Sequence, residues 1–279
     1  MSDDAVKYRT RHRAFVKMHG LRNHFVIVDV RQDPWSPGID EIARIYDVQT
    51  GVGADQLILI EPSRSAAAFM RILNEDGREA EACGNATRCV AWLLLEESAA
   101  DSVLLETRVG VLRCDRAGDR RVRCEMGKLN MDWRRIPLSE KRDTLHLGIG
   151  LDGLKDPVAV SVGNPHAVFF VDDIDCIDLK AIGPKLQKDP LFPQQVNIGV
   201  AQMLSAERMR LAVYERGAGL TMACGSGACA AVFAARARGL TSADSVTVSL
   251  PGGDMQIEIR ADDMAIMTGP VAFSFLGEL

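Results

Sequence analysis

Two stretches of the chain are apolar on nearly every side of a helical projection, and each closely follows an Ala-Cys-Gly tripeptide. Residues 89–95 read CVAWLLL and residues 228–235 read ACAAVFAA. A helix without a polar face is usually buried on all sides. The pattern therefore predicts two central helices, each enclosed by other structure.

Regular alternation of polar and apolar residues is found in both halves after the predicted helix. GVLRCD and RVRCEM flank a turn at residues 117–119, and SVTVSL and DMQIEI flank a turn at residues 251–253. Alternation with period two is typical of strands with one buried face, and glycine in the turns favours hairpins. We therefore expect each half to be a curved sheet enclosing one helix.

The two halves also repeat at a fixed offset of 141 residues, which is the separation of Cys83 from Cys224. Around these cysteines, ACGN at residues 82–85 matches ACGS at residues 223–226. At the same offset Asn23, Gln56 and Asn74 fall on Asn164, Asn197 and Glu215. Polar side chains that keep this spacing indicate a duplicated domain.

The repeat predicts an α/β (α+β) fold of two pseudo-symmetric domains, each a curved mixed or antiparallel sheet around a central helix. The predicted N-terminal domain comprises residues 1–129 with 270–279, and the predicted C-terminal domain comprises residues 130–269. Residues 131–156 have few periodic elements. We interpret that segment as the linker.

Composition and charge narrow the classes of function. The net charge of −5 provides no basic field for a polyanion, so nucleic acid is not expected as a partner. No apolar run approaches the roughly 20 residues that span a bilayer, so we expect no membrane partner and a cytoplasmic protein.

The basic stretch at residues 7–17 is interpreted as a solvated tail. Seven cysteines without metal-ligand spacing make disulfides and metals unexpected.

Cys83 and Cys224 lie where the predicted helices begin. A helix N-terminus favours an anion, so it can lower the pKa of a thiol and make it a usable base, or an acid once protonated. Gly84, Gly225 and Gly227 leave room for a ligand carboxylate. The alternative is that both cysteines are small buried apolar residues, as we expect for the remaining five, Cys89, Cys114, Cys124, Cys176 and Cys229.

A pair of thiols suits inversion of a stereocentre. The reaction needs a base on one face of the carbon and an acid on the other, and a duplicated domain supplies both. Backbone N–H groups at two helix N-termini would stabilise the enediolate form of the carbanion. No cofactor is then required, and the sequence contains neither a complete dinucleotide fingerprint nor a phosphate-binding loop.

From Lys17 onward the chain resembles the diaminopimelate epimerase family. The motifs that carry the resemblance are KMHGLRNHFVIVD, GADQLILIE, ILNEDG, ACGNATRC, GNPHAVFFVDD, VNIG, YERGAG and ACGSGACAA. The resemblance implies epimerisation of LL-2,6-diaminopimelate to meso-2,6-diaminopimelate, in lysine and peptidoglycan-precursor synthesis, without a cofactor or metal. We expect the protein to act on this small-molecule substrate as a homodimer. It also implies an active site between two similar domains.

The resemblance assigns roles to individual residues. Cys83 and Cys224 match the acid/base pair, and His166 and Glu215 match positions that tune the thiols. The positions that match carboxylate-binding neighbours are Gly84, Asn85, Gly225 and Ser226. The positions that match other substrate contacts are Asn23, Gln56, Asn74, Asn164, Asn197, Glu215 and Arg216.

The chain departs from the family pattern at Arg22, His24 and Ala86, which affects the expected shape of two loops. Two alternatives stay open at this point. The first is another two-thiol enzyme of the same fold, such as a proline or hydroxyproline racemase or a phenazine-pathway isomerase. The second is a thiol redox switch that uses Cys83 and Cys224 as a reversible disulfide.

Overall fold

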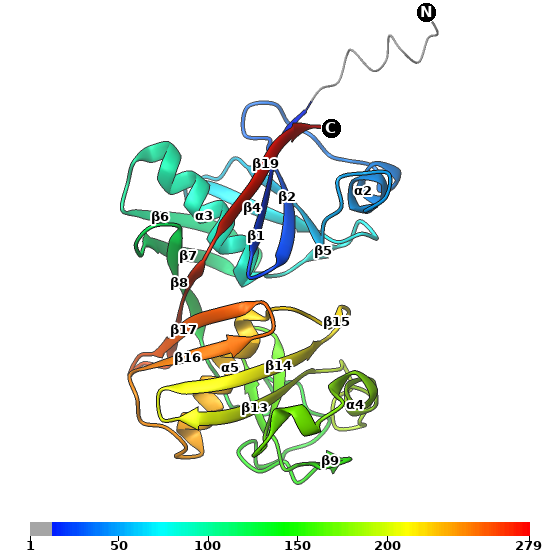
Figure 1. Ribbon diagram of the computed structural model, residues 1–279, viewed down its shortest axis with the longest axis vertical. Coiled ribbons are helices and arrows are strands. Elements are labelled where there is room, and N and C mark those ends of the chain that lie inside the picture. The colour runs from blue at the N-terminus through cyan, green and yellow to red at the C-terminus, as the bar shows by residue number, and fades with distance from the viewer. Residues whose placement is uncertain (1–12) are drawn as a thin grey trace, which may run out of the picture. The chain divides into compact units, whose positions relative to one another are not determined.

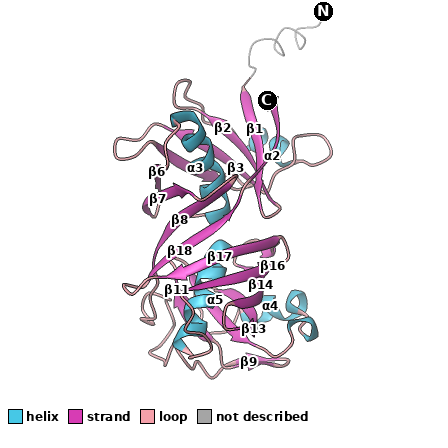
Figure 2. Ribbon diagram, turned by 60° about the vertical axis from the view of Figure 1, so that its left-hand side comes forward, coloured by secondary structure: helices cyan, strands magenta, loops and turns pink. Residues whose placement is uncertain are grey.

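The computed structural model describes residues 13–279, and these form two compact units (Figures 1 and 2). The first unit runs to Val122 and also includes Pro270–Leu279, whereas the second comprises Arg123–Gly269. The boundary lies inside strand β8 (Arg121–Lys128). Each unit is a mixed sheet with one buried helix, which confirms the predicted fold class.

The sheet of the first unit runs in the order β19, β1, β2, β3, β4, β6, β7. Its strands are β1 (Ala14–Gly20), β2 (Asn23–Asp29), β3 (Gln56–Glu61), β4 (Ala68–Leu73), β6 (Ser102–Thr107), β7 (Gly110–Arg116) and β19 (Ala272–Glu278). The pairs β2–β3 and β4–β6 are parallel, and the other neighbours are antiparallel. The short strand β5 (Glu79–Ala80) pairs with the end of β4.

The second unit repeats this arrangement. Its strands are β11 (Val158–Ser161), β12 (Pro165–Phe170), β13 (Asn197–Ser205), β14 (Arg208–Glu215), β16 (Ser245–Leu250), β17 (Gly253–Ile259) and β18 (Met264–Pro270), in that order across the sheet. Here β12–β13 and β14–β16 are the parallel pairs. The short strand β15 (Gly219–Leu220) pairs with the end of β14, as β5 does with β4. A separate ribbon is formed by β9 (Gly150–Leu151) and β10 (Leu154–Lys155).

The repeat extends to strand register. In the first unit Phe25 of β2 is the partner of Gln56 of β3. In the second unit His166 of β12 is the partner of Asn197 of β13, and both lie 141 residues further along. The polar residues that repeat in sequence therefore occupy equivalent places in the two sheets.

The two predicted central helices are present as α3 (Gly84–Ser98) and α5 (Gly225–Ala237). Helix α3 packs against β1, β2, β6 and β7, and α5 packs against β11, β12, β13, β14 and β17 (Figure 1). Their apolar residues are buried nearly throughout. Burial on all sides explains why neither helix has a polar stripe.

The outer face of each sheet is covered by a shorter helix. In the first unit α2 (Ile39–Tyr46) packs Ile42 and Ile45 against Val26 and Val28 of β2. In the second unit α4 (Leu179–Leu186), preceded by the 3₁₀ turn η1 (Ile174–Cys176), covers the corresponding face. Since side chains alternate along a strand, Phe25 and His166 point to the opposite faces, where α3 and α5 lie.

The interpretation of residues 131–156 as a linker was wrong. Ile136, Leu138 and Leu147 are buried in the same core cluster as Phe169 and Ile198 of the second unit. The segment covers the outer face of that sheet as largely irregular chain, so its apolar residues have no helical or strand period. It belongs to the second unit.

Two further expectations need correction. Most of the predicted solvated tail lies outside the described residues, but Lys17 lies in β1 with only 7% of its surface exposed. Of the five cysteines expected to be buried, Cys176 is exposed, whereas Cys89, Cys114, Cys124 and Cys229 are buried as expected. In the described part of the chain, no helix is long and apolar enough to cross a bilayer.

Candidate active site

Cys83 occupies the N-cap of α3. Its backbone is extended (φ −147°, ψ 104°), and the helix begins at Gly84. The residue is partly exposed. The first N–H groups of a helix have no partner within it, so a ligand anion beside the Cys83 sulfur would meet donors there.

A chain of amides adjoins this thiol. The Sγ of Cys83 lies 3.6 Å from Oδ1 of Asn23, to which it can donate. The same oxygen accepts a hydrogen bond from Nδ2 of Asn85 at 3.2 Å. Three predicted site residues are thus brought together by the start of β2 and the start of α3.

Gln56 and Asn74 form a second polar pair in the first unit. The Nε2 of Gln56 donates to Oδ1 of Asn74 at 3.4 Å. The other end of the Gln56 amide, Oε1, is buried and has no hydrogen-bond partner among residues 13–279. A buried acceptor of this kind is stabilised when a ligand donor reaches it.

Cys224 holds the equivalent N-cap of α5 and is more deeply buried than Cys83, with 4% of its surface exposed. Its sulfur accepts a hydrogen bond from the backbone N–H of Gly227 at 3.3 Å and lies 3.6 Å from Oγ of Ser226. A β-carbon on Gly227 would lie 3.1 Å from that sulfur and 2.9 Å from Cγ2 of Val213. Any larger residue here would therefore crowd the Val213 side chain and the Cys224 thiol.

The carboxyl of Glu215, at the end of β14, accepts a hydrogen bond from the hydroxyl of Thr221, and its charge acts on the Cys224 thiol. Burial raises the pKa of this carboxyl above its ordinary value. Burial, followed by the charge of Glu215, holds the pKa of Cys224 well above its ordinary value. Cys224 is therefore a protonated thiol at neutral pH. For this thiol the sequence expectation was wrong in sign, because burial and a neighbouring carboxylate outweigh the helix terminus.

His166 connects three predicted site residues. Its Nε2 lies 3.1 Å from Oδ1 of Asn164, 3.1 Å from Oγ of Ser226 and 3.4 Å from Nδ2 of Asn197. Burial, and secondly the charge of Arg216, lower the pKa of His166 to about 3. The imidazole is therefore neutral. If Nε2 carries the proton it donates toward Asn164 Oδ1 or the Ser226 hydroxyl, and if it does not, it accepts from Ser226 or from Asn197 Nδ2.

Arg216 follows β14 and is exposed. Its backbone N–H donates to Oδ1 of Asn197 at 2.8 Å, and Nη1 donates to the carbonyl of Gln194 at 3.1 Å. Within residues 13–279 the guanidinium makes one hydrogen bond, through Nη1 to the Gln194 carbonyl, and a carboxylate could approach its remaining donors.

Sequence reasoning missed three polar residues that contact this set: Asp55, Arg88 and Thr221. Asp55 accepts from Asn23, Arg88 donates to Asn85, and Thr221 donates to Glu215. A charged residue inside an otherwise apolar helix was a signal that could have identified Arg88. Asp55 and Thr221 had no such signal.

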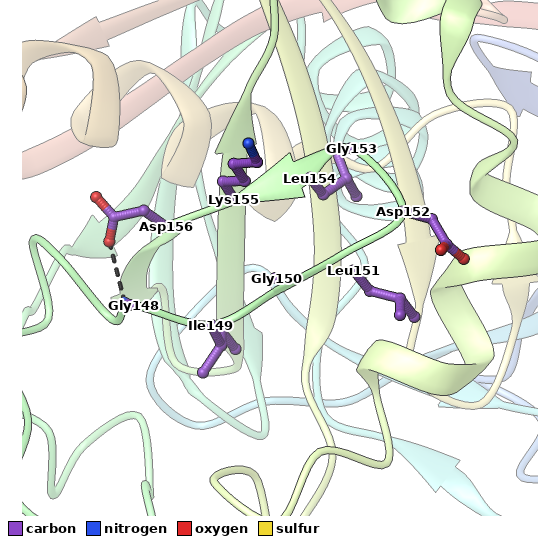
Figure 3. Close-up of a pocket in the computed structure, with 9 residues that line it drawn as sticks. All are labelled: Gly148, Ile149, Gly150, Leu151, Asp152, Gly153, Leu154, Lys155 and Asp156. Atoms are coloured by element: carbon purple, nitrogen blue, oxygen red, sulfur yellow. Dashed lines mark hydrogen bonds between the residues drawn. The ribbon is translucent and has the colours of Figure 1, made fainter.

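The loop cavity in Figure 3 lies apart from these residues. It is lined by residues 148–156 around the β9–β10 ribbon, and its one drawn hydrogen bond joins the Gly148 N–H to the Asp156 carboxylate at 3.0 Å. None of the predicted site residues lines it. Within residues 13–279, no group of three or more His, Cys, Asp and Glu side chains is arranged to hold a metal ion.

Comparisons with a family model and with curated proteins identify the same family. A family model described as diaminopimelate epimerase matches residues 15–131 and 158–274. The chain is 50% identical to a diaminopimelate epimerase of Rhodospirillum centenum, covering 96% of this chain and 92% of that protein. It is 49% identical to one of Acidiphilium cryptum, with 96% of both chains covered.

Solved structures with the same fold are more distant in sequence. A phenazine biosynthesis protein of the PhzF family from Bacillus anthracis superposes with a TM-score of 0.70 at 16% identity, covering 97% of this chain and 99% of that one. A hydroxyproline epimerase from Agrobacterium vitis gives a TM-score of 0.69 at 15% identity, covering 97% and 93%. At these identities the likeness is one of fold.

Proposed function

Because the chain belongs to the diaminopimelate epimerase family, we propose that it interconverts LL- and meso-2,6-diaminopimelate through Cys83 and Cys224. The observation that carries the proposal is the equivalent placement of the two thiols. Each caps the buried helix of its own unit, at positions related by the internal repeat. The protein is an isomerase that shifts one proton and needs no redox partner for that step.

The two thiols have different surroundings, and this supports different roles. Cys224 is held protonated beside Glu215, so it acts as the proton donor in one direction of the reaction and recovers that proton in the other. Cys83, the more accessible thiol, acts as base when Cys224 acts as acid. His166 stays neutral and keeps Ser226 in place.

The backbone at each helix start binds the carboxylate of the reacting centre. Gly84 and Asn85 begin α3, and Gly225 and Ser226 begin α5. As the α-proton leaves, negative charge develops on that carboxylate, and preorganised N–H groups stabilise the resulting enediolate.

The far end of the substrate is a second amino acid, with a carboxylate and an ammonium. Arg216 supplies a cationic fork for the carboxylate, and Gln56, Asn74, Asn164 and Asn197 supply amide groups. Glu215 belongs with the reacting centre, because its charge acts on the Cys224 thiol.

We further propose a cytoplasmic homodimer that acts in lysine biosynthesis on a small-molecule substrate, without nucleic acid or membrane partners. None of the seven cysteines, all of which lie in the described residues, forms a disulfide, which suits a reducing compartment. Strand β19 exposes Phe273, Phe275 and Leu276, an apolar surface that a second copy of the chain would cover.

The test of the function is a panel of substrates followed by chiral chromatography. We expect rapid interconversion of LL- and meso-diaminopimelate, and none of proline or hydroxyproline. Proline racemised faster than diaminopimelate would overturn the proposal in favour of the alternative enzymes. These alternative enzymes are not favoured, since the hydroxyproline epimerase and the probable proline racemase that resemble this chain share only its fold.

A further inference from the structure

Two charged residues bracket the asparagine pair beside Cys83. At one end, Oδ2 of Asp55 accepts hydrogen bonds from Nδ2 of Asn23 at 3.0 Å and from the backbone N–H of His24 at 2.7 Å. At the other end, Nη2 of Arg88 donates to Oδ1 of Asn85 at 2.8 Å. Arg88 is 0% exposed although it carries a charge.

These charges determine which way each amide is turned. A carboxylate can only accept, so Asn23 must direct its NH₂ toward Asp55 and its oxygen toward Asn85. A guanidinium can only donate, so Asn85 must direct its oxygen toward Arg88 and its NH₂ toward Asn23. The two requirements agree at the 3.2 Å hydrogen bond between the asparagines. The chain from Arg88 to Asp55 therefore has one direction, fixed from both ends.

The direction matters for Cys83, whose sulfur lies 3.6 Å from Oδ1 of Asn23. An acceptor oxygen at that place can take the S–H of a thiol but opposes a thiolate. If Asn23 were turned over, its NH₂ would donate to the sulfur and favour the thiolate. The orientation of Asn23 therefore sets which form of Cys83 its surroundings stabilise.

The second unit has no such charged pair at the equivalent positions. At the offset of 141 residues, Asp55 falls on Val196 and Arg88 falls on Cys229, and both of these are buried and apolar. Phe25 instead falls on His166, whose neutral imidazole lies within hydrogen-bond distance of Asn164 and Ser226. The charged bracket is thus a feature of the Cys83 unit.

We propose that Asp55 and Arg88 are positioning residues for epimerisation, which together hold Asn23 and Asn85 in the orientation that presents an acceptor to the Cys83 thiol. The proposal rests on the function proposed above. Because each charge alone can fix the direction of the chain, the effects of removing them are not independent.

The experiment is a double-mutant cycle with Asp55→Asn and Arg88→Met. We expect each single variant to lower kcat about threefold, whereas the double variant loses on the order of 10²-fold, more than the product of the two. Arg88→Lys in the Asp55→Asn background keeps a charge that can only donate, so we expect it to restore kcat to the Asp55→Asn level.

A second measurement separates orientation from loss of structure. The rate of Cys83 alkylation by iodoacetamide is followed against pH by peptide mass spectrometry, without substrate. The double variant removes one charge of each sign, so simple charge effects largely cancel. Loss of the acceptor then moves the alkylation midpoint about one unit to lower pH.

The matched control is Glu96→Gln with Arg116→Met, an ion pair near the other end of α3. This variant should leave both the midpoint and kcat unchanged. If Arg88→Met unfolds the protein, as judged by circular dichroism, Arg88→Gln replaces it, since an amide can be turned either way.

The proposal would be overturned if the folded double variant kept the wild-type pH midpoint of Cys83 alkylation. It would also be overturned if the loss of kcat in the double variant equalled the product of the losses in the two single variants. Failure of the wild-type protein to epimerise diaminopimelate would instead overturn the proposed function, because the alkylation measurement does not depend on turnover.

Discussion

The Sγ of Cys224 accepts a hydrogen bond from the backbone N–H of Gly227 at 3.3 Å inside the second unit. Burial together with the Glu215 carboxylate keeps the pKa of the Cys224 thiol well above its ordinary value. The Cys83 thiol instead adjoins the amide of Asn23 and is partly exposed. Two thiols in equivalent positions of a repeat are therefore placed in different chemical surroundings.

Replacing either thiol should abolish epimerisation. Cys83→Ala and Cys224→Ala each remove the proton acceptor or donor on one face of the α-carbon, and we expect kcat to fall by at least ~10⁴-fold with the fold intact. A chiral assay and circular dichroism check this. The control is Cys114→Ala, which should stay active while losing about 1 kcal/mol of stability, since Cys114 is buried in β7. Substantial turnover by either thiol variant would rule out the two-thiol mechanism.

His166 should make the protein sensitive to mild acid. Burial lowers the pKa of His166 from 6.5 to about 3, so between those values the folded state binds fewer protons than the unfolded state. The stability that the fold gains by keeping His166 neutral is fully present above pH 6.5. As the pH falls from 6.5 toward 3, the free energy of unfolding decreases by about 1.4 kcal/mol per pH unit.

The measurement is urea unfolding of wild type and His166→Gln at pH 7 and pH 4.5. Between pH 7 and pH 4.5 the free energy of unfolding should drop in both proteins. We expect the drop to be about 2–3 kcal/mol smaller in the variant, which cannot gain a proton at this position. The same fall in both proteins would show that His166 is not held neutral by the fold.

Gly227→Ala should impair catalysis by crowding the Cys224 sulfur. The added carbon would lie 3.1 Å from that sulfur and 2.9 Å from Val213, so the thiol or the helix start must shift. We expect kcat to fall roughly 10²-fold, because small displacements of a reacting group are costly. Gly199→Ala, where the nearest atom is 3.6 Å away, is the matched control and should behave like wild type. Equal activity of the two variants would contradict this role for Gly227.

Arg216→Met should lower kcat/KM for diaminopimelate by orders of magnitude, through loss of the fork that binds the distal carboxylate. The wild-type enzyme should turn over lysine, which lacks that carboxylate, much more slowly than diaminopimelate, because the Arg216 fork then has no carboxylate to bind. Steady-state kinetics with both compounds test this. Unchanged turnover of diaminopimelate by the Arg216 variant would remove Arg216 from the distal site.

The sequence was most informative where structure depends on local pattern. The apolar runs after Cys83 and Cys224 predicted the two central helices. The offset of 141 residues predicted a duplicated domain, and the strand registers at Gln56 and Asn197 repeat at that offset. It failed for residues 131–156, whose buried side chains such as Ile136 have no period because the chain there is largely irregular.

Contacts that depend on tertiary structure were also beyond reach. Asp55 meets Asn23 across 32 residues, through the pairing of β2 with β3. The raised pKa of Cys224 depends on burial and on Glu215, neither of which is visible at a helix start in sequence. A single sequence indicated which residue types carry the chemistry, whereas their mutual electrostatics required the fold.

The most direct test of the account is solvent-deuterium incorporation during turnover of LL-diaminopimelate in D₂O. Both thiols exchange with solvent, so a proton removed by one thiol is replaced by a deuteron from the other. Early in the reaction, mass spectrometry and chiral chromatography should find one deuterium at the inverted α-carbon of meso-diaminopimelate and none in the unreacted substrate. Inverted product that retains its original α-hydrogen, or no inversion at all, would contradict proton transfer by Cys83 and Cys224.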